Sequence, residues 1–151
     1  MGLLVFANGE TFATGGIKYE YRPATPRETT NRIILEVQIE GVTTQAVVDT
    51  GAPYVICAPT IAERAGVDST LALARQTMLV RGMRLEGFVV RLNMTLKAEI
   101  GEDLTVDATV FVPEVPEYWG DFPSFIGLTG FLERIRFAVD PNEDMFYFGQ
   151  L

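Results

Sequence analysis

The feature that most restricts the fold of this chain is an alternation of apolar and polar residues that begins at residue 32. Leu35, Val37 and Ile39 are separated by single polar residues, which is the two-residue period of a strand with one buried face. Glu40-Gly41 then provides a turn, and residues 42–48 return as a second strand. A β-hairpin therefore leads directly into the segment that begins at Asp49.

The rest of the chain predicts more short strands and little helix. Strands are expected near residues 3–6, 17–21, 54–57, 78–80, 88–92, 94–98, 104–112, 124–127, 135–139 and 145–148. A short helix is expected from Pro59 to Ala65, with a proline near its start and Gly66 just past its end. Residues 129–134 suit one or two helical turns, and residues 113–123 suit an irregular loop. The fold class is all-β.

Composition excludes several kinds of chemistry. Twelve Lys and Arg face twenty Asp and Glu, a formal charge of −8, so nucleic acid is not an expected partner. The chain has no histidine, which excludes a Ser-His-Asp triad, a Cys-His pair and an ordinary His-containing zinc site. The single Cys57 lies in an apolar run and is expected to be a buried structural thiol. No metal or organic cofactor is expected.

The beginning of the sequence does not suggest export. Its apolar run, residues 3–7, is too short for a signal peptide or a transmembrane helix. Together with the single cysteine, this favours a soluble protein of a reducing compartment, the cytoplasm. A fragment of a longer protein stays open as an alternative.

The segment Asp49-Thr50-Gly51-Ala52 follows three small or branched apolar residues and precedes another apolar strand. Taken alone, it has the composition of an ordinary β-turn. A second segment, Phe125-Ile126-Gly127, ends 78 positions after Asp49 (127 − 49). Taken alone, that segment is a common core pattern. The two together, in this order and at this spacing, are more specific than either.

The pair resembles the retropepsin-like aspartic peptidases, which carry such an Asp-Thr-Gly-Ala segment early and a hydrophobic-hydrophobic-Gly segment late. The resemblance covers about residues 32–148. It implies a closed or partly open acid-protease β-barrel with a flap hairpin and one or two short helices. Residues 32–151 would form the protease domain, and residues 1–31 an N-terminal extension or edge strands of the same single domain.

The resemblance also implies roles for individual residues. Asp49 would be the catalytic carboxylate, and Thr50 would hydrogen-bond across a dimer axis to the partner's loop. Gly51 would allow the sharp turn and offer its N–H to the carboxylate, while Ala52 would border the substrate cleft. Ile126 and Gly127 would pack behind the loop, with Gly127 allowing close backbone approach.

Residues 81–87 become the tip of the flap under this resemblance. Gly82 would bring backbone hydrogen bonds to the substrate, and Met83 and Trp119 would contact it. Without the resemblance the hairpin is an exposed turn, Met83 is ordinary packing, and Trp119 is a core lid or a dimer contact. Pro53 departs from the family, which often carries Ser, Thr or Asp there, so a side chain that could support the carboxylate is missing.

The expected function is that of an aspartic endopeptidase whose partners are a second copy of itself and a peptide or protein substrate. Two close carboxylates cannot both ionise, so a pair of Asp49 residues would share a proton and activate a water. One Asp-Thr-Gly per chain then requires a homodimer. The alternatives are a non-catalytic retropepsin-fold module for dimerisation or peptide binding, and an unrelated small β-barrel binding protein, which predicts a monomer.

Overall fold

Strands make up most of the secondary structure in residues 2–151, the part of the chain that the computed structural model describes. The strands are β1 (Leu4–Val5), β2 (Thr11–Ala13), β3 (Gly15–Lys18), β4 (Glu20–Arg22), β5 (Arg32–Ile39), β6 (Val42–Val48), β7 (Val55–Ile56), β8 (Ala74–Val80), β9 (Met83–Leu96), β10 (Ile100–Gly101), β11 (Leu104–Pro113), β12 (Ser124–Ile126), β13 (Ile135–Asp140) and β14 (Met145–Gln150). The helical segments are α1 (Pro59–Arg64) and the 3-10 turns η1 (Ser69–Leu71), η2 (Pro116–Tyr118) and η3 (Leu132–Arg134). The all-β prediction with short helices is confirmed.

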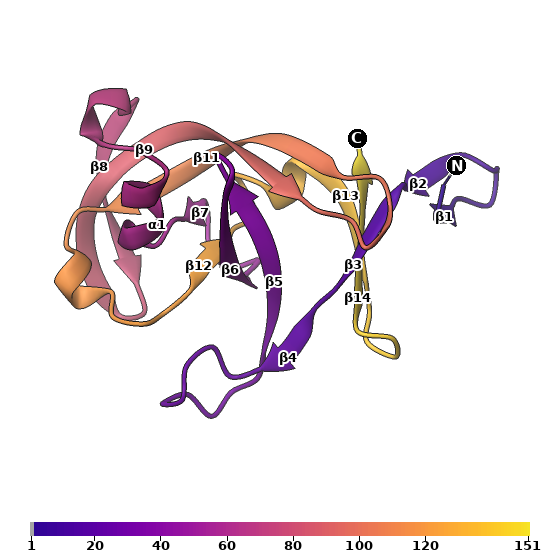
Figure 1. The fold of residues 1–151 in the computed structure, drawn as a ribbon, viewed down its shortest axis with the longest axis horizontal. Coiled ribbons are helices and arrows are strands. Elements are labelled where there is room, and N and C mark those ends of the chain that lie inside the picture. Colours follow the sequence, from indigo (N-terminus) through magenta and orange to yellow (C-terminus); the bar gives the residue numbers. More distant parts are fainter. Residues whose placement is uncertain (1) are drawn as a thin grey trace.

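The largest sheet curls into a partly open barrel (Figure 1). Its strand order is β4-β5-β6-β12-β7-β11-β9-β8, and β5 pairs additionally with β9. That extra pairing joins only Gln38 and Ile39 to Thr95 and Met94, so the barrel closes over a short length. Strands β9 and β11 are its longest pair, and they arch over the top of the view in Figure 1.

Apolar side chains fill both faces of this sheet. Neighbouring side chains of β5 pack into two separate groups of buried apolar residues. Ile34 lies in the group on one face of the sheet and Leu35 in the group on the other. The same holds for Val47 and Ala46 of β6. Burying a large aliphatic side chain stabilises a fold by about 1.5–3 kcal/mol. Strand β6, which leads into Asp49, is therefore fixed in register by two layers of packing.

The first hairpin and the first helix lie where the sequence predicts them. Glu40 and Gly41 form the turn between β5 and β6, both with positive φ (47° and 83°), as a two-residue hairpin turn requires. Helix α1 begins at Pro59, and Gly66 follows its end with a φ of 73°. Both predictions are confirmed.

The second hairpin differs from the prediction. Its turn is only Arg81-Gly82, with φ values of 53° and 81°, and β9 begins at once with Met83. The predicted seven-residue tip (residues 81–87) is wrong, and so is the division of β9 into two strands. Residues 87–90 are all buried because this part of β9 is covered on both faces, so the two-residue period disappears there.

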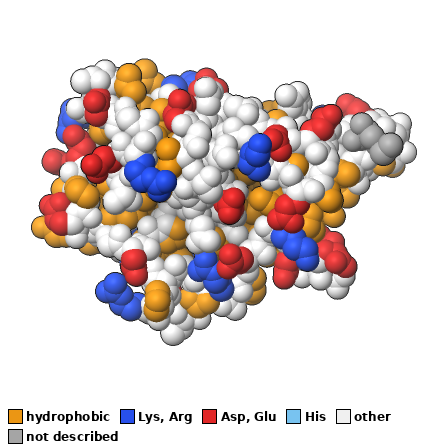
Figure 2. Space-filling model, viewed as in Figure 1, with side chains coloured by type: hydrophobic (Ala, Val, Ile, Leu, Met, Phe, Trp, Pro, Cys, Tyr) orange, Lys and Arg blue, Asp and Glu red, His pale blue; other side chains and the backbone are white. Residues whose placement is uncertain are grey.

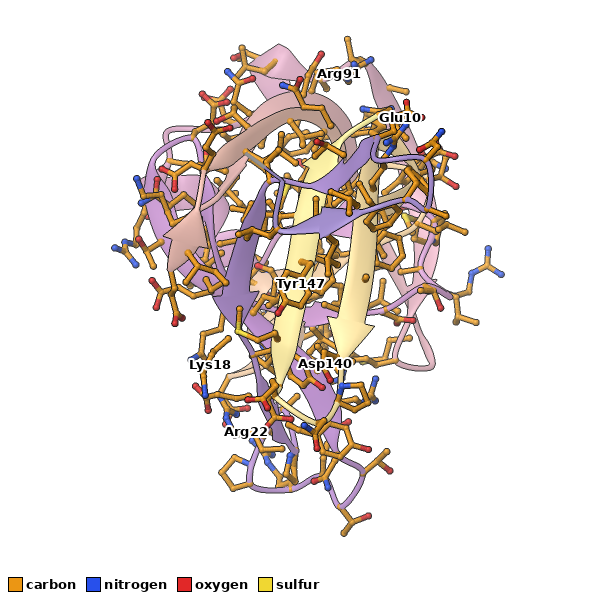
Figure 3. The ribbon with its side chains drawn as sticks, turned by 90° about the vertical axis from the view of Figure 1, so that its right-hand side faces the viewer. Glu10, Lys18, Arg22, Arg91, Asp140 and Tyr147 are labelled. Atoms are coloured by element: carbon orange, nitrogen blue, oxygen red, sulfur yellow. The ribbon has the colours of Figure 1, made fainter. Side chains whose placement is uncertain are left out.

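The N-terminal residues are part of the same packing. Strand β3 lies between β10 and β14 in a four-stranded sheet of order β10-β3-β14-β13, and its Ile17 is buried. The edge strand expected at residues 17–21 is therefore split into an interior strand and β4, which edges the large sheet. Figure 3 looks onto the four-stranded sheet, with Tyr147 on the side facing the viewer. A Cβ at Gly149 would meet the Phe12 carbonyl oxygen at 2.4 Å, so β2 crosses closely over β14.

Cys57 is fully buried, as the sequence predicts, and burial raises the pKa of its thiol to about 12. Since the pKa in the folded protein lies above the ordinary value of 9.0, Cys57 contributes its full share of stability below about pH 9 and loses it as the pH rises towards 12. We expect a thiol reagent at pH 8 to modify the folded protein about a hundredfold more slowly than the urea-unfolded protein. Equal rates, followed by mass spectrometry, would contradict this burial.

No helix in residues 2–151 is long and apolar enough to cross a membrane. On the face in Figure 2, basic and acidic side chains are interspersed, and the basic ones do not gather into a patch.

Candidate active site

Asp49 lies where two sequence segments that are far apart in the chain become neighbours. Strand β6 ends at Val48, which pairs in parallel with Ile126 of β12. The Asp49 N–H then donates to the Ile126 carbonyl oxygen at 2.9 Å. The Asp-Thr-Gly segment and the Phe-Ile-Gly segment therefore form one structural unit.

The loop itself orients the carboxylate. The Gly51 N–H donates to Asp49 Oδ1 at 2.9 Å, and the Ala52 N–H donates to the Asp49 carbonyl oxygen at 3.1 Å. Asp49 is partly buried, whereas Thr50 and Gly51 are exposed. The tip of the loop thus faces outward while its carboxylate is held in a defined position.

Gly127 supports the loop from behind. A Cβ at this position would lie 2.1 Å from the Tyr54 carbonyl oxygen and 2.7 Å from that of Ala52. The Ala52 carbonyl also accepts a hydrogen bond from the Leu128 N–H at 2.8 Å, so the loop cannot move away without losing this bond. Ile126 is fully buried beside it. Only glycine fits the backbone contact at residue 127.

A pocket of about 220 Å³ opens beside the carboxylate. On one side lie Asp49, Gly51, Ala52 and Pro53, and on the other lie residues 78–81 of the second hairpin. The remaining lining residues are Arg32, Ile56 and Phe125. Asp49 is the only acidic residue in this lining, so one protomer brings a single carboxylate to the pocket.

The predicted substrate-contacting residues do not all reach this pocket. Ala52 does, whereas Gly82 is exposed in the hairpin turn and does not line it. Met83 and Trp119 line a neighbouring pocket of about 380 Å³, and Arg81 lines both pockets.

Trp119 is only 4% exposed. Its indole N–H donates to the Phe122 carbonyl oxygen at 2.7 Å, and its ring packs edge-on against Phe125 at a centroid distance of 6.1 Å. These contacts favour the core role that the sequence left open for this residue.

The sequence did not single out several residues that line the Asp49 pocket. The outer strand of the second hairpin contributes Met78, Leu79 and Val80, and the alternation of buried, exposed and buried side chains there is a usable signal. Arg32 and Arg81 carry no such signal because nothing in their local pattern places them near residue 49. Within residues 2–151 there is no cluster of three or more His, Cys, Asp or Glu that could hold a metal ion.

The comparisons with known proteins agree with this geometry. A family model for aspartyl protease matches residues 35–114, just over half of the chain. The structure is similar to a retropepsin-like aspartic protease from Rickettsia conorii, with 22% identity and a TM-score of 0.58 over 89% of this chain and 90% of that one. It is also similar to the retroviral protease-like domain of Ddi1 from Leishmania major, with 20% identity and a TM-score of 0.51 over 80% of this chain and 94% of that domain. No curated protein sequence matches the chain.

The partly open barrel, with its Asp-Thr-Gly loop against the Phe-Ile-Gly strand, thus has the retropepsin-like acid-protease fold. The chain belongs to the aspartyl protease family.

Proposed function

We propose that this protein is an aspartic endopeptidase that acts as a homodimer, with a water molecule activated between two Asp49 carboxylates, one from each protomer. The observation that carries the proposal is the position of the Asp49 carboxylate. It is held by the Gly51 N–H at 2.9 Å, at the side of a pocket that the loop shares with the second hairpin.

The dimer follows from the number of carboxylates. Proton transfer to and from the reacting groups needs two carboxyl groups in different protonation states, and the pocket of one protomer has only Asp49. The tip of the loop is free to meet a second copy, since Thr50 and Gly51 are exposed and Leu128 beside them is 41% exposed. Thr50 would then hydrogen-bond to the partner's loop across the axis.

The pair would work by sharing one proton, because two carboxylates at close range cannot both be ionised. The ionised Asp49 takes a proton from the bound water, and the protonated Asp49 donates one to the oxygen of the scissile carbonyl. The water oxygen attacks the carbonyl carbon, and a tetrahedral intermediate forms. The Asp49 that took the proton from water then gives it to the amide nitrogen, the other Asp49 takes a proton back from a hydroxyl of the intermediate, and the C–N bond breaks.

The β8–β9 hairpin is suited to act as the flap. Its inner residues Met78 and Val80 are buried against the core, while Leu79 between them is 71% exposed. The guanidinium carbon of Arg81 lies 3.7 Å from the centroid of the Phe122 ring, which holds the turn of the hairpin against the loop that precedes β12. Opening the flap would break this contact and expose the apolar side chains beneath it.

The proposal is tested by measuring solution mass and peptide cleavage on the same samples. We expect a dimer by light scattering, and cleavage of a library of extended peptides with apolar residues around the scissile bond. Because only the dimer is active, activity per milligram should fall when the protein is diluted below its dimer dissociation constant. A monomer that cleaves nothing between pH 4 and pH 7 would refute the proposal.

A non-catalytic binding module is the second candidate, and Pro53 is the observation that favours it. Pro53 lines the Asp49 pocket but brings no side-chain hydrogen-bonding group to support the carboxylate. Such a module would dimerise and bind extended peptides without cleaving them. Measuring peptide binding and product formation together separates the two functions.

A further inference from the structure

The pocket beside Asp49 contains more positive than negative side chains, although the chain as a whole carries a formal charge of −8. Arg32 and Arg81 line it together with the single carboxylate of Asp49. Its volume of about 220 Å³ is below the usual range for pockets that enclose a whole small molecule. The pocket is therefore of a size for one side chain of a longer ligand.

Arg81 presents an unpaired cation at this pocket. Its guanidinium lies over the Phe122 ring at 3.7 Å, and it forms no ion pair among the described residues. Stacking occupies the face of the guanidinium plane, whereas the N–H groups point outward within that plane. Arg81 is thus held in place and still has donors available for a carboxylate.

Arg32 is only partly satisfied where it lies. Its Nη2 is 3.2 Å from Glu28 Oε2, but its Nε–H is buried and has no hydrogen-bond partner in the described part of the chain. The other oxygen of Glu28, Oε1, is also buried without a partner. The ion pair therefore uses one contact where a guanidinium and a carboxylate can form two. The buried Nε–H is not accessible to a ligand, so Arg32 contributes mainly a positive charge to the pocket lining, and Glu28 offsets part of that charge.

The acidic groups near these two cations lie mainly in the neighbouring pocket, which Arg81 also lines, and most of them are paired with an arginine. Asp49 is the only carboxylate of the pocket, and in the proposed dimer the two Asp49 residues share a proton. Glu28, Glu117 and Asp121 line the neighbouring pocket. Glu28 is paired with Arg32 and Asp121 lies 3.5 Å from Arg27, while Glu117 is an exposed carboxylate that lines only that neighbouring pocket and not the Asp49 pocket. An acidic side chain entering beside Arg81 would gain charge-assisted hydrogen bonds that a neutral side chain cannot match.

We propose that the pocket lined by Arg32 and Arg81 is a subsite for an acidic side chain, Glu or Asp, of the peptide substrate. This inference rests on the proposed peptidase function and assigns its substrate class at one position. Arg81 at the turn of the flap and Arg32 at the start of β5 are the residues that determine this specificity.

The test compares peptide pairs that differ only by Glu or Gln at one position, scanned along the substrate. At one position we expect wild type to show a kcat/KM ratio, Glu over Gln, of about tenfold or more. Arg81→Gln and Arg32→Gln should each bring that ratio close to one, while Arg81→Lys should keep part of it. The preference should also vanish below about pH 4, where the Glu side chain of the peptide is protonated.

Arg84 provides the matched control. It lies in the same hairpin, is exposed, and does not line the pocket, so Arg84→Gln should keep the wild-type ratio. A ratio near one in wild type at every position, or an equal loss in Arg84→Gln, would overturn the subsite while leaving the peptidase function standing.

If no peptide is cleaved, the peptidase function fails and the subsite is tested by binding. In Asp49→Asn protein, calorimetry should then show the Glu peptide binding about tenfold more tightly than the Gln peptide. Equal affinities would overturn the subsite.

Discussion

Replacing Asp49 with asparagine is expected to lower kcat/KM for peptide cleavage by about a thousandfold or more. Asparagine has nearly the same shape, and its side-chain oxygen can still accept the Gly51 N–H that now reaches Asp49 Oδ1 at 2.9 Å. The fold should therefore be kept, with a change in unfolding free energy of less than about 1 kcal/mol. What is lost is the only group of the pocket that can take a proton from water.

The control for this substitution is Asp107→Asn. Asp107 is an exposed carboxylate 2.7 Å from Arg91, and an exposed pair of this kind contributes about 0–1 kcal/mol. Its loss should leave cleavage unchanged. If Asp49→Asn protein instead kept more than about a tenth of wild-type activity, the chemistry would have to lie elsewhere.

Mixing the two proteins separates catalysis by a dimer from catalysis by a monomer. When inactive Asp49→Asn protein exchanges subunits with wild type, each mixed dimer has only one functional carboxylate. Activity should therefore fall as the Asp49→Asn protein is added in excess, even though the amount of wild type is constant. Activity that stays constant despite subunit exchange would show that one Asp49 is enough.

Gly127→Ala is expected to lower the free energy of unfolding by about 3 kcal/mol and to abolish cleavage. The added methyl group would lie 2.1 Å from the Tyr54 carbonyl oxygen, and the backbone on that side is fixed by its own hydrogen bonds. Relief requires β12 and the Asp49 loop to move apart. Urea unfolding followed by fluorescence measures the change, and the melting temperature should fall by about 6–12 °C.

The matched substitution is Gly66→Ala, just past the end of α1. Gly66 has a φ of 73°, but an added Cβ would meet no atom within 4 Å. The cost should be only the backbone strain, about 1 kcal/mol, with cleavage retained. If the two substitutions cost the same, the contact between Gly127 and the Tyr54 carbonyl is looser than the structure indicates.

The sequence predicts best those parts of this protein whose cause is local. The β5–β6 hairpin follows from a strict two-residue period with a two-residue turn, and α1 from a proline at its start and a glycine after its end. The link between the Asp49 and Gly127 segments is predicted only by the resemblance to the retropepsin-like peptidases, because neither segment is specific when taken alone. The structure places them side by side through the parallel pairing of β6 and β12.

The rest depends on contacts between distant parts of the chain. Strand β9 is covered on both faces at residues 87–90, which removes the alternation that would have revealed its length. Trp119 lies in a loop with several prolines, and only the tertiary structure turns its ring inward against Phe125. Arg32 and Arg81 both line the pocket beside Asp49 because the sheet is curved into a barrel, and no local sequence pattern predicts that curvature.

The place of β3 in the four-stranded sheet bears on how the protein is made. Gly15 pairs with Phe148, 133 positions further along the chain (148 − 15), so β3 has no partner strand in β14 until all the residues between them have been synthesised. Pairings between distant segments are slow to form because the loop between them must close first. Until then the edge of β3 that pairs with β14 stays open to wrong partners, and a nascent chain cannot complete this sheet before β14 has been synthesised.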